Sequence, residues 1–347
     1  MKAVILSGGL GTRLRPLTNQ LPKPLIPIMG KPVIEYILDL LKKSDIDEIF
    51  ITLQYQAEAF MDILGDGSKL GINLKYIIED QPLGTAGCIK NIEQYLNDTF
   101  VVISGDILTD IDLAKVIDFH KNNNSCLTMP LVKVNDPTQY GIVSADEQGK
   151  ITCFKEKPKA SEVFTNIINT GIYVCNPEVL TLFGKNLKFD FSKDLFPLMM
   201  QKKIPIYGMV TDRYWCDIGN INSYLKVHCD LLDGKLNLNL NSPEMLPRVY
   251  TGNNCSISHS AKISGPVFIG NDSIIDEDVV IQPYTIIGDC SVIHQCVHIS
   301  NSVLWNQCDI GEYSNIEKCV LCNNVSLKHN ISIFDMALQS SGKGVAI

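Results

Sequence analysis

The sequence lacks the features that mark membrane, secreted and disulfide-rich proteins. No stretch approaches the roughly 20 apolar residues of a membrane-spanning helix, and the apolar run after Met1 is too short for a secretion signal. Twelve cysteines are scattered over 347 residues, without the dense spacing of a disulfide framework. We therefore expect a cytoplasmic protein with reduced thiols and no membrane partner.

Positive charge is also scarce, because the formal net charge is −8. A nucleic-acid-binding protein needs a basic face against the phosphate backbone, so this charge argues against such a partner. The N-terminus is the exception, because no acidic residue comes before Glu35. A cationic segment in an acidic protein predicts a small anionic ligand, since a concentrated positive field attracts anions. The cations of this segment are Lys2, Arg13, Arg15, Lys23 and Lys31.

Two familiar phosphate motifs are missing from the signature loop, LSGGLGTRLRPLTNQLPKPLIPI, residues 6–28. Leu14 stands where a dinucleotide fingerprint has its third glycine, and no Gly-Lys-Ser/Thr follows as in a P-loop. The glycines still let the backbone approach a phosphate closely, and the prolines stiffen the loop that carries Arg13 and Lys23. The loop therefore predicts a preorganised phosphate site of another kind.

Up to about residue 232 the chain has an α/β pattern. Short runs rich in β-branched residues alternate with segments whose apolar residues recur at helical spacing, as at 34–41 and 86–96. This alternation predicts a parallel sheet covered by helices, with ligands at the carboxyl ends of the strands. The predicted strands are 2–7, 48–53, 74–79 and 99–104.

From Ile257 the hydrophobic period changes to six, and a small or β-branched residue follows each isoleucine by four positions. This pattern predicts a left-handed parallel β-helix, whose six-residue faces form triangular coils with isoleucines stacked inside. Trp305 interrupts the period, which resumes one residue early at Ile310, so we expect a bulge or a small loop there. The isoleucines are at 257, 263, 269, 275, 281, 287, 293 and 299.

Five further motifs follow the signature loop. They are PLGTAG (82–87), SGD (104–106), EKP (156–158), NTGIY (169–173) and YWCDIGN (214–220). Together with the loop they resemble the sugar-1-phosphate nucleotidylyltransferases, which make a nucleotide sugar and pyrophosphate from a nucleoside triphosphate and a sugar 1-phosphate. PLGTAG and YWCDIGN are most similar to the mannose-1-phosphate guanylyltransferase branch, which implies GDP-mannose as the product.

The resemblance also implies an architecture. We expect a Rossmann-like nucleotidyltransferase domain with a mixed, mostly parallel sheet, followed by a left-handed β-helix. In many relatives such a β-helix mediates assembly, so a homo-oligomer is expected. The expected boundaries are a catalytic domain over 1–232, a linker over 233–250, the β-helix over 251–335 and a C-terminal tail over 336–347.

Site residues are carried over motif by motif. The resemblance assigns phosphate contacts to Arg13 and Lys23, and a Mg²⁺ site to Asp106 and Asp217, which suits an ion that takes one or two carboxylates plus phosphate oxygens. These four are the expected catalytic residues. The nucleotide is assigned to Gly8, Gly9, Gly11, Thr12, Arg13, Gln81, Gly84 and Thr85. The sugar phosphate is assigned to Gly105, Tyr140, Gly141, Glu156, Lys157, Asn169, Thr170 and Gly171.

Elementary chemistry agrees with this reaction. The attacking sugar phosphate is already an anion near neutral pH, so it needs no general base, and the histidines before residue 232, His120 and His228, lie outside the motifs. What the transfer needs is alignment of two mutually repelling anions and neutralisation of charge at the α-phosphorus. For Thr85 the sequence also allows a purely structural role as the N-cap of a helix over TAGCIKNIEQYL.

Other functions stay open on the sequence alone. Thymidylyl- and uridylyltransferases for glucose 1-phosphate share most of these residues. A regulatory homologue without catalysis is a second alternative, although Arg13 and Lys23 are both present. A third is a bifunctional enzyme whose β-helix also transfers acyl groups. Its bases would be His259, His294 and His298.

Overall fold

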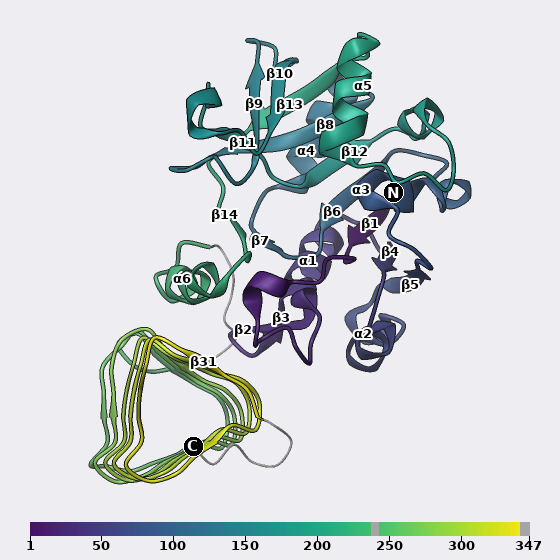
Figure 1. Ribbon diagram of the computed structural model, residues 1–347. Coiled ribbons are helices and arrows are strands. Elements are labelled where there is room, and N and C mark those ends of the chain that lie inside the picture. Colours follow the sequence, from purple (N-terminus) through teal and green to yellow (C-terminus); the bar gives the residue numbers. More distant parts are fainter. Residues whose placement is uncertain (237–242, 341–347) are drawn as a thin grey trace. The chain divides into compact units, whose positions relative to one another are not determined.

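A computed structural model describes residues 1–236 and 243–340. Residues 237–242 of the predicted linker and 341–347 of the predicted tail lie outside the described residues. The chain forms two compact units, each drawn in Figure 1. The first unit comprises Met1–Gly9 and Ile34–Trp215, and the second comprises Leu10–Val33 and Cys216–Ile347. No helix in the described ranges is long and apolar enough to cross a membrane.

The first unit is built on a mixed ten-stranded sheet in the order β10-β9-β11-β8-β12-β6-β1-β4-β5, with β13 beside β8. All four predicted strands are confirmed, and they form its parallel half, β6-β1-β4-β5. Antiparallel pairs extend the sheet from β6 to β10, while β13 runs parallel to β8. The bounds are β1 (Lys2–Leu6), β4 (Glu48–Leu53), β5 (Asn73–Ile78), β6 (Phe100–Ser104), β8 (Leu127–Lys133), β9 (Gly141–Ala145), β10 (Ile151–Glu156), β11 (Ile167–Asn169), β12 (Ile172–Cys175) and β13 (Ile206–Val210).

Helices are connected to these strands as the α/β pattern predicts. Ile34, Ile37, Leu38 and Leu41 of the first helix are fully buried, which confirms its apolar face. The second predicted helix is shorter than its periodicity suggests, because it ends at Lys90 and only a 3₁₀ turn follows. The helices are α1 (Val33–Lys42), α2 (Ala57–Leu64), α3 (Gly84–Lys90), α4 (Leu113–Asn122) and α5 (Phe196–Gln201), and two further strands are β7 (Ile107–Thr109) and β14 (Trp215–Asp217).

In the second unit, short parallel strands stack into the triangular coils visible in Figure 1. One face contains β15 (Glu244–Leu246), β16 (Val249–Thr251), β19 (Val267–Ile269), β22 (Thr285–Ile287), β25 (Val303–Leu304), β28 (Val320–Leu321) and β31 (Ala337–Leu338). The next contains β17 (Ser256–Ile257), β20 (Ile274–Ile275), β23 (Val292–Ile293), β26 (Asp309–Ile310) and β29 (Ser326–Leu327). The third contains β18 (Lys262–Ile263), β21 (Val280–Ile281), β24 (His298–Ser300), β27 (Asn315–Glu317) and β30 (Ser332–Phe334).

The isoleucine repeat forms the interior of these coils. Ile275, Ile281, Ile287, Ile293 and Ile299 are fully buried in one continuous core. Ile257 and Ile263 are only partly covered, because they belong to the first coil of the stack. The hexapeptide pattern therefore predicts the interior register correctly.

The bulge or loop expected at Trp305 is wrong. Ile269 pairs with Ile287, a step of 18 residues, whereas Ile287 pairs with Leu304, a step of 17. One corner is thus a residue shorter, and Leu304 takes the internal place that the six-residue period assigns to residue 305. Leu321 and Leu338 continue the shorter step. Trp305 follows directly and is itself buried.

The second unit also contains most of the signature loop and the helix that precedes the linker. The loop forms two 3₁₀ turns, at Thr12–Leu14 and Lys23–Leu25, and a small hairpin of β2 (Pro27–Ile28) and β3 (Lys31–Pro32). Helix α6 (Ile221–Leu232) begins with Asn220 as N-cap, whose side chain accepts a hydrogen bond from the Ser223 N–H.

Candidate active site

In the first unit, the carboxyl ends of β1, β4 and β6 bring three loops to one edge. The Gly105 N–H donates to the Leu6 carbonyl at 2.9 Å, so Gly105 and Asp106 lie beside the start of the signature loop. A Cβ on Gly105 would lie 2.5 Å from Ser7 Oγ, which excludes any side chain there. The Tyr55 hydroxyl donates to the Gly9 carbonyl at 2.8 Å. The structure thus places Gly8, Gly9, Gly105 and Asp106 at the edge where α/β sheets bind ligands.

The PLGTAG segment opens α3, but Thr85 does not cap it. The N-cap is Leu83, without a side-chain cap, and the Thr85 N–H and hydroxyl both donate to Asp190 Oδ1 at 3.2 Å. Asp190, 105 residues away in the sequence, accepts these hydrogen bonds in place of a local cap. It lies in none of the motifs described above. Gly84 has φ +74°, and a Cβ there would lie 2.8 Å from the Phe189 carbonyl oxygen.

Around PLGTAG, the exposed Gln81 and Thr85 side chains are accessible to a ligand. Glu79, which sequence reasoning missed, accepts a hydrogen bond from the Leu83 N–H at 3.3 Å. Burial raises the pKa of Glu79, against hydrogen bonds from Leu83, Gln54 and Cys88 that lower it. Gln54 in turn lies next to Gly8, 3.0 Å from where a Cβ would be. The PLGTAG segment and the glycines are therefore neighbours within this unit.

The predicted sugar-phosphate residues fall into two groups in the first unit. In the first, Gly141 of β9 lies opposite Glu156 of β10, and a Cβ on Gly141 would lie 2.8 Å from Glu156 Oε2. Burial raises the pKa of Glu156, while the charge of Lys157 opposes the shift. A glycine at 141 therefore leaves the space that the Glu156 carboxylate occupies.

The second group surrounds the NTGIY motif. Asn169 donates to the Tyr173 hydroxyl at 2.8 Å and accepts from the Gly171 N–H at 3.0 Å. Thr170 is held at both ends, because its hydroxyl donates to the Pro130 carbonyl and its own carbonyl accepts from Trp215 Nε1. These bonds fix Asn169 and Thr170, both buried, in single orientations.

An aromatic contact joins Tyr140 to this group. Its ring meets Trp215 edge to face at 5.3 Å between centroids. Trp215 and Tyr173 lie within quoted motifs, but the sequence reasoning gave neither a role. Burial raises the pKa of the Tyr173 hydroxyl, and the nearby Glu156 carboxylate adds to the shift. Glu156 therefore lies within electrostatic range of the NTGIY group.

In the second unit, the signature loop meets the YWCDIGN motif. Lys23 Nζ lies 3.0 Å from Asp217 Oδ1, although 194 residues separate them in sequence. A Cβ on Gly219 would lie 3.1 Å from Asp217 Oδ2 and 3.5 Å from an Arg13 guanidinium nitrogen. Gly219 is thus the point around which Arg13 and Asp217 gather. The Lys23 side chain is 9% exposed, whereas Arg13 is open to solvent.

The glycine turn of the signature loop is held by a threonine hydroxyl from the same loop. Gly11 has φ +59°, which favours glycine, and its carbonyl accepts from Thr18 Oγ1 at 2.8 Å. Thr12 follows as an exposed residue at the start of a 3₁₀ turn. This conformation presents Thr12 and Arg13 to solvent from a backbone that is already ordered.

The two carboxylates predicted to bind Mg²⁺ belong to different units, Asp106 to the first and Asp217 to the second. Among residues 1–236 and 243–340, no group of three or more His, Cys, Asp or Glu side chains could hold an ion alone. A divalent ion at either carboxylate would need further ligands, such as the phosphate oxygens that usually accompany Mg²⁺.

Comparison with known proteins gives the family. Residues 2–234 match a family model described as Nucleotidyl transferase. The chain belongs to this family. Residues 247–346 match a second model, described as EIF2B subunit epsilon LbH domain, in agreement with the left-handed β-helix.

Individual relatives of this nucleotidyl transferase carry several substrate names. A Synechocystis sp. protein named UTP–glucose-1-phosphate uridylyltransferase is 36% identical over 78% of this chain and 74% of its own. A Yarrowia lipolytica protein named mannose-1-phosphate guanyltransferase is 37% identical over 76% of this chain and 73% of its own. The crystal structure of HddC from Yersinia pseudotuberculosis, complexed with GMP-PN, is 32% identical, with a TM-score of 0.55 over 65% of this chain and 96% of that one.

Proposed function

We propose that this nucleotidyl transferase makes GDP-mannose and pyrophosphate from GTP and mannose 1-phosphate. The observation that carries the proposal is the contact of Lys23 with Asp217, beside the approach of Arg13 and Asp217 to Gly219, since phosphoryl transfer needs charge aligned at the phosphates. The choice of guanine and mannose is supported by relatives with guanylyltransferase names, at 34–39% identity.

In the proposed reaction, a phosphate oxygen of mannose 1-phosphate attacks the α-phosphorus of GTP. The new P–O bond forms as the bond to the bridging oxygen breaks, and pyrophosphate leaves with that electron pair. Arg13 and Lys23 neutralise charge on the phosphates, which lowers the repulsion between the two anions. No side chain has to remove a proton, because the nucleophile is already ionised.

Mg²⁺ would be held by Asp106 and Asp217, and when bound it would neutralise charge on the phosphate oxygens. The donor set fits this ion, because Mg²⁺ takes one or two carboxylates together with phosphate oxygens and water. The pairing of Asp217 with Lys23 keeps a carboxylate and an ammonium next to each other, where we propose that the phosphates bind.

The remaining roles follow the motifs. We assign the phosphates to the backbone at Gly8, Gly9, Gly11 and Thr12, and the base to Gln81, Gly84 and Thr85. We assign the sugar phosphate to Gly105, Tyr140, Gly141, Glu156, Lys157, Asn169, Thr170 and Gly171. A cytoplasmic location and a homo-oligomer assembled through the β-helix are part of the same proposal.

The test is a matrix of pyrophosphate release with GTP, UTP, dTTP, ATP and CTP, each against mannose, glucose, galactose and glucosamine 1-phosphates. The highest kcat/KM is expected for GTP with mannose 1-phosphate. The Synechocystis relative favours UTP with glucose 1-phosphate as the second candidate, and preference for that pair would overturn the substrate assignment. Acetyl-CoA-dependent turnover of an amino-sugar phosphate would instead support the alternative of a bifunctional enzyme with acyltransferase activity in the β-helix.

A further inference from the structure

The hairpin that ends the signature loop carries a methionine at a turn position that usually holds glycine, asparagine or aspartate. Met29 has φ +49° and Gly30 has φ +76°, so both central residues are left-handed. Glycine adopts this conformation freely, but a side chain such as that of Met29 pays a steric penalty, which persists only where surrounding contacts enforce it. Lys23 is the first residue of the 3₁₀ turn Lys23–Leu25, which comes just before this hairpin.

One of the enforcing contacts comes from His228 in α6. Its Nδ1 lies 2.9 Å from the Tyr224 carbonyl oxygen, which can only accept, so Nδ1 carries the proton. The other nitrogen, Nε2, is then free of a proton and accepts from the Met29 N–H at 3.3 Å. The neutral imidazole therefore holds the strained turn through its backbone.

A second contact reaches the turn from the β-helix. The Tyr224 hydroxyl donates to the Pro27 carbonyl at 2.6 Å and accepts from Trp305 Nε1 at 2.8 Å. Tyr224 is completely buried and Trp305 nearly so. Hairpin residues and coil residues such as Ile286 and Asn306 line the same small cavity, of about 10 Å³.

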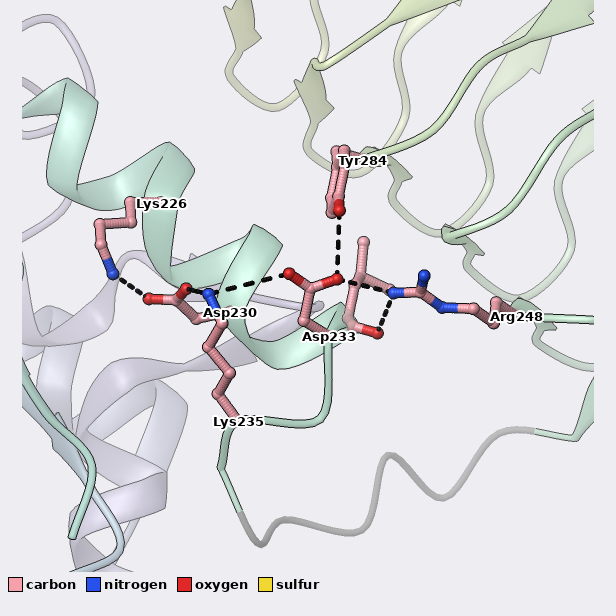
Figure 2. A network of polar contacts seen from close by, with 7 residues as sticks. Lys226, Asp230, Asp233, Lys235, Arg248 and Tyr284 are labelled. Carbon is pink, nitrogen blue, oxygen red and sulfur yellow. Dashed lines mark hydrogen bonds and ion pairs between the residues drawn. The ribbon is translucent and has the colours of Figure 1, made fainter. Parts of the chain in front are cut away.

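The C-terminal end of α6 is attached to the β-helix as well, as Figure 2 shows. Asp233 Oδ1 accepts from Arg248 at 2.6 Å and from the Tyr284 hydroxyl at 3.2 Å. Asp230, almost fully buried, pairs with Lys226 and Lys235. Helix α6 thus has two ties to the coils, at Tyr224 and at Asp233, and two to the loop, at Tyr224 and His228.

We propose that Trp305 and Tyr224 are positioning residues for catalysis, which hold the signature loop so that Lys23 meets Asp217. The chain of contacts runs from the Trp305 indole through the Tyr224 hydroxyl to the Pro27 carbonyl, close to Lys23. Asp217 ends β14 shortly before α6, so the helix that binds the loop of Lys23 also follows Asp217 in the chain. The proposal rests on the proposed function, because it assigns these residues to the turnover of that site.

The test combines steady-state kinetics with hydrogen exchange of residues 23–32 in the full-length protein. Tyr224→Phe removes only the hydroxyl, and is expected to lower kcat about 10-fold or more while KM changes less than about threefold, because small displacements of aligned groups are costly. Exchange at Met29 should quicken by about 3- to 10-fold. Trp305→Phe removes one donor, and should shift both readouts in the same direction by about threefold.

Tyr76→Phe is the matched control, because it removes a hydroxyl that donates to the Gly65 carbonyl at 2.6 Å in the first unit. It should leave kcat and exchange at 23–32 unchanged, even where its melting temperature falls as much as that of Tyr224→Phe. Unchanged exchange in Tyr224→Phe would overturn the proposal, as would faster exchange with normal kcat. If the wild-type protein turns over no pair in the substrate matrix, the proposed function fails, and exchange alone then decides whether the network orders the loop.

Discussion

At the scale of single residues, the pair of Lys23 and Asp217 explains why the signature loop and the YWCDIGN motif occur in one chain. Each motif alone could be read as a charged surface segment. The salt bridge joins a buried lysine to a half-buried carboxylate, and Arg13, close to Gly219, leaves these three side chains with a net positive charge that would attract anionic substrates. Loss of the Asp217 charge would therefore leave the buried Lys23 without this ion pair.

We predict that Asp217→Asn and Asp106→Asn each reduce Mg²⁺-dependent turnover by about 100-fold or more, because each removes a proposed ligand of the ion that neutralises the phosphates. Initial rates across a Mg²⁺ titration measure the effect. Asp62→Asn, at an exposed position of α2, is the control and should keep the wild-type rate. Most of the wild-type rate at saturating Mg²⁺ in either variant would remove that residue from the metal site.

Arg13 supports a prediction about the transition state. Lysine cannot reproduce the planar fork of donors that a guanidinium presents to phosphate, so Arg13→Lys should depress kcat more than it raises KM. The exposed Arg15→Lys, two residues away, is the matched control. An unchanged kcat in Arg13→Lys would make the arginine a ground-state binder only.

His228 gives the stability of the protein a pH dependence. Burial lowers the pKa of His228 to about 4, and the residues that line the cavity beside it are uncharged. In the unfolded chain its pKa is near 6.5, so between about pH 6.5 and 4 the unfolded state binds the proton first. The free energy of unfolding should therefore decrease as the pH is lowered through this range, by at most about 1.4 kcal/mol per pH unit from this group.

Urea unfolding at several pH values measures that slope. His228→Gln should reduce this slope by the contribution of up to one proton taken up on unfolding. His259→Gln, at an exposed corner of the β-helix, should leave the slope as in the wild type. Equal slopes in wild type and His228→Gln would mean that His228 does not titrate across unfolding in this range.

At the scale of elements, the sequence predicts regular repeats well and long-range replacements poorly. The isoleucine period identifies the interior of the coils because every coil repeats the same environment. The period predicts a bulge or a small loop at Trp305 where the structure has a shortened corner before Leu304, because the period alone cannot tell where a missing residue falls. The alternative role of Thr85 as an N-cap is wrong, and the sequence does not reveal its partner Asp190, which accepts from its N–H and hydroxyl, because Asp190 is remote in sequence.

The same reasoning applies to the site. Strand ends predict that Gly8, Gly9 and Asp106 lie at one edge, because parallel strands place their carboxyl ends together. The contact of Lys23 with Asp217 depends on how α6 and the loop pack, and no local pattern encodes that. Without the family resemblance, the motif spacing would not have connected them.

The interior of the β-helix should be intolerant of truncation. Ile287→Ala removes a fully buried side chain between stacked coils and is expected to cost about 2–5 kcal/mol of unfolding free energy. Ile274→Ala, at a neighbouring position that is 42% exposed, is the control and should cost less than about 1 kcal/mol. Chemical denaturation measures both. Similar costs for the two variants would contradict the assigned register.

At the scale of the whole molecule, the predicted assembly can be tested by removing the coils. Light scattering of the full chain should give a homo-oligomer, and a variant that ends at Leu236 should contain fewer subunits, because stacked coils offer flat faces and an open end for another subunit. Circular dichroism of the truncated protein checks that its α/β part stays folded. An unchanged oligomer would place the interface in the N-terminal part of the chain.

The membership of residues 10–33 in the second compact unit has a consequence for recombination between relatives. A chimaera joined between the two family matches, after residue 234, would combine one parent's Tyr224 and Pro27 with the other parent's residue at 305. Such a crossover takes the hydrogen-bonded residues Pro27, Tyr224 and Trp305 from two different parents. The exchangeable module is the discontinuous one, residues 10–33 together with 216–340, so inheritance of a foreign β-helix should require inheritance of its matching signature loop.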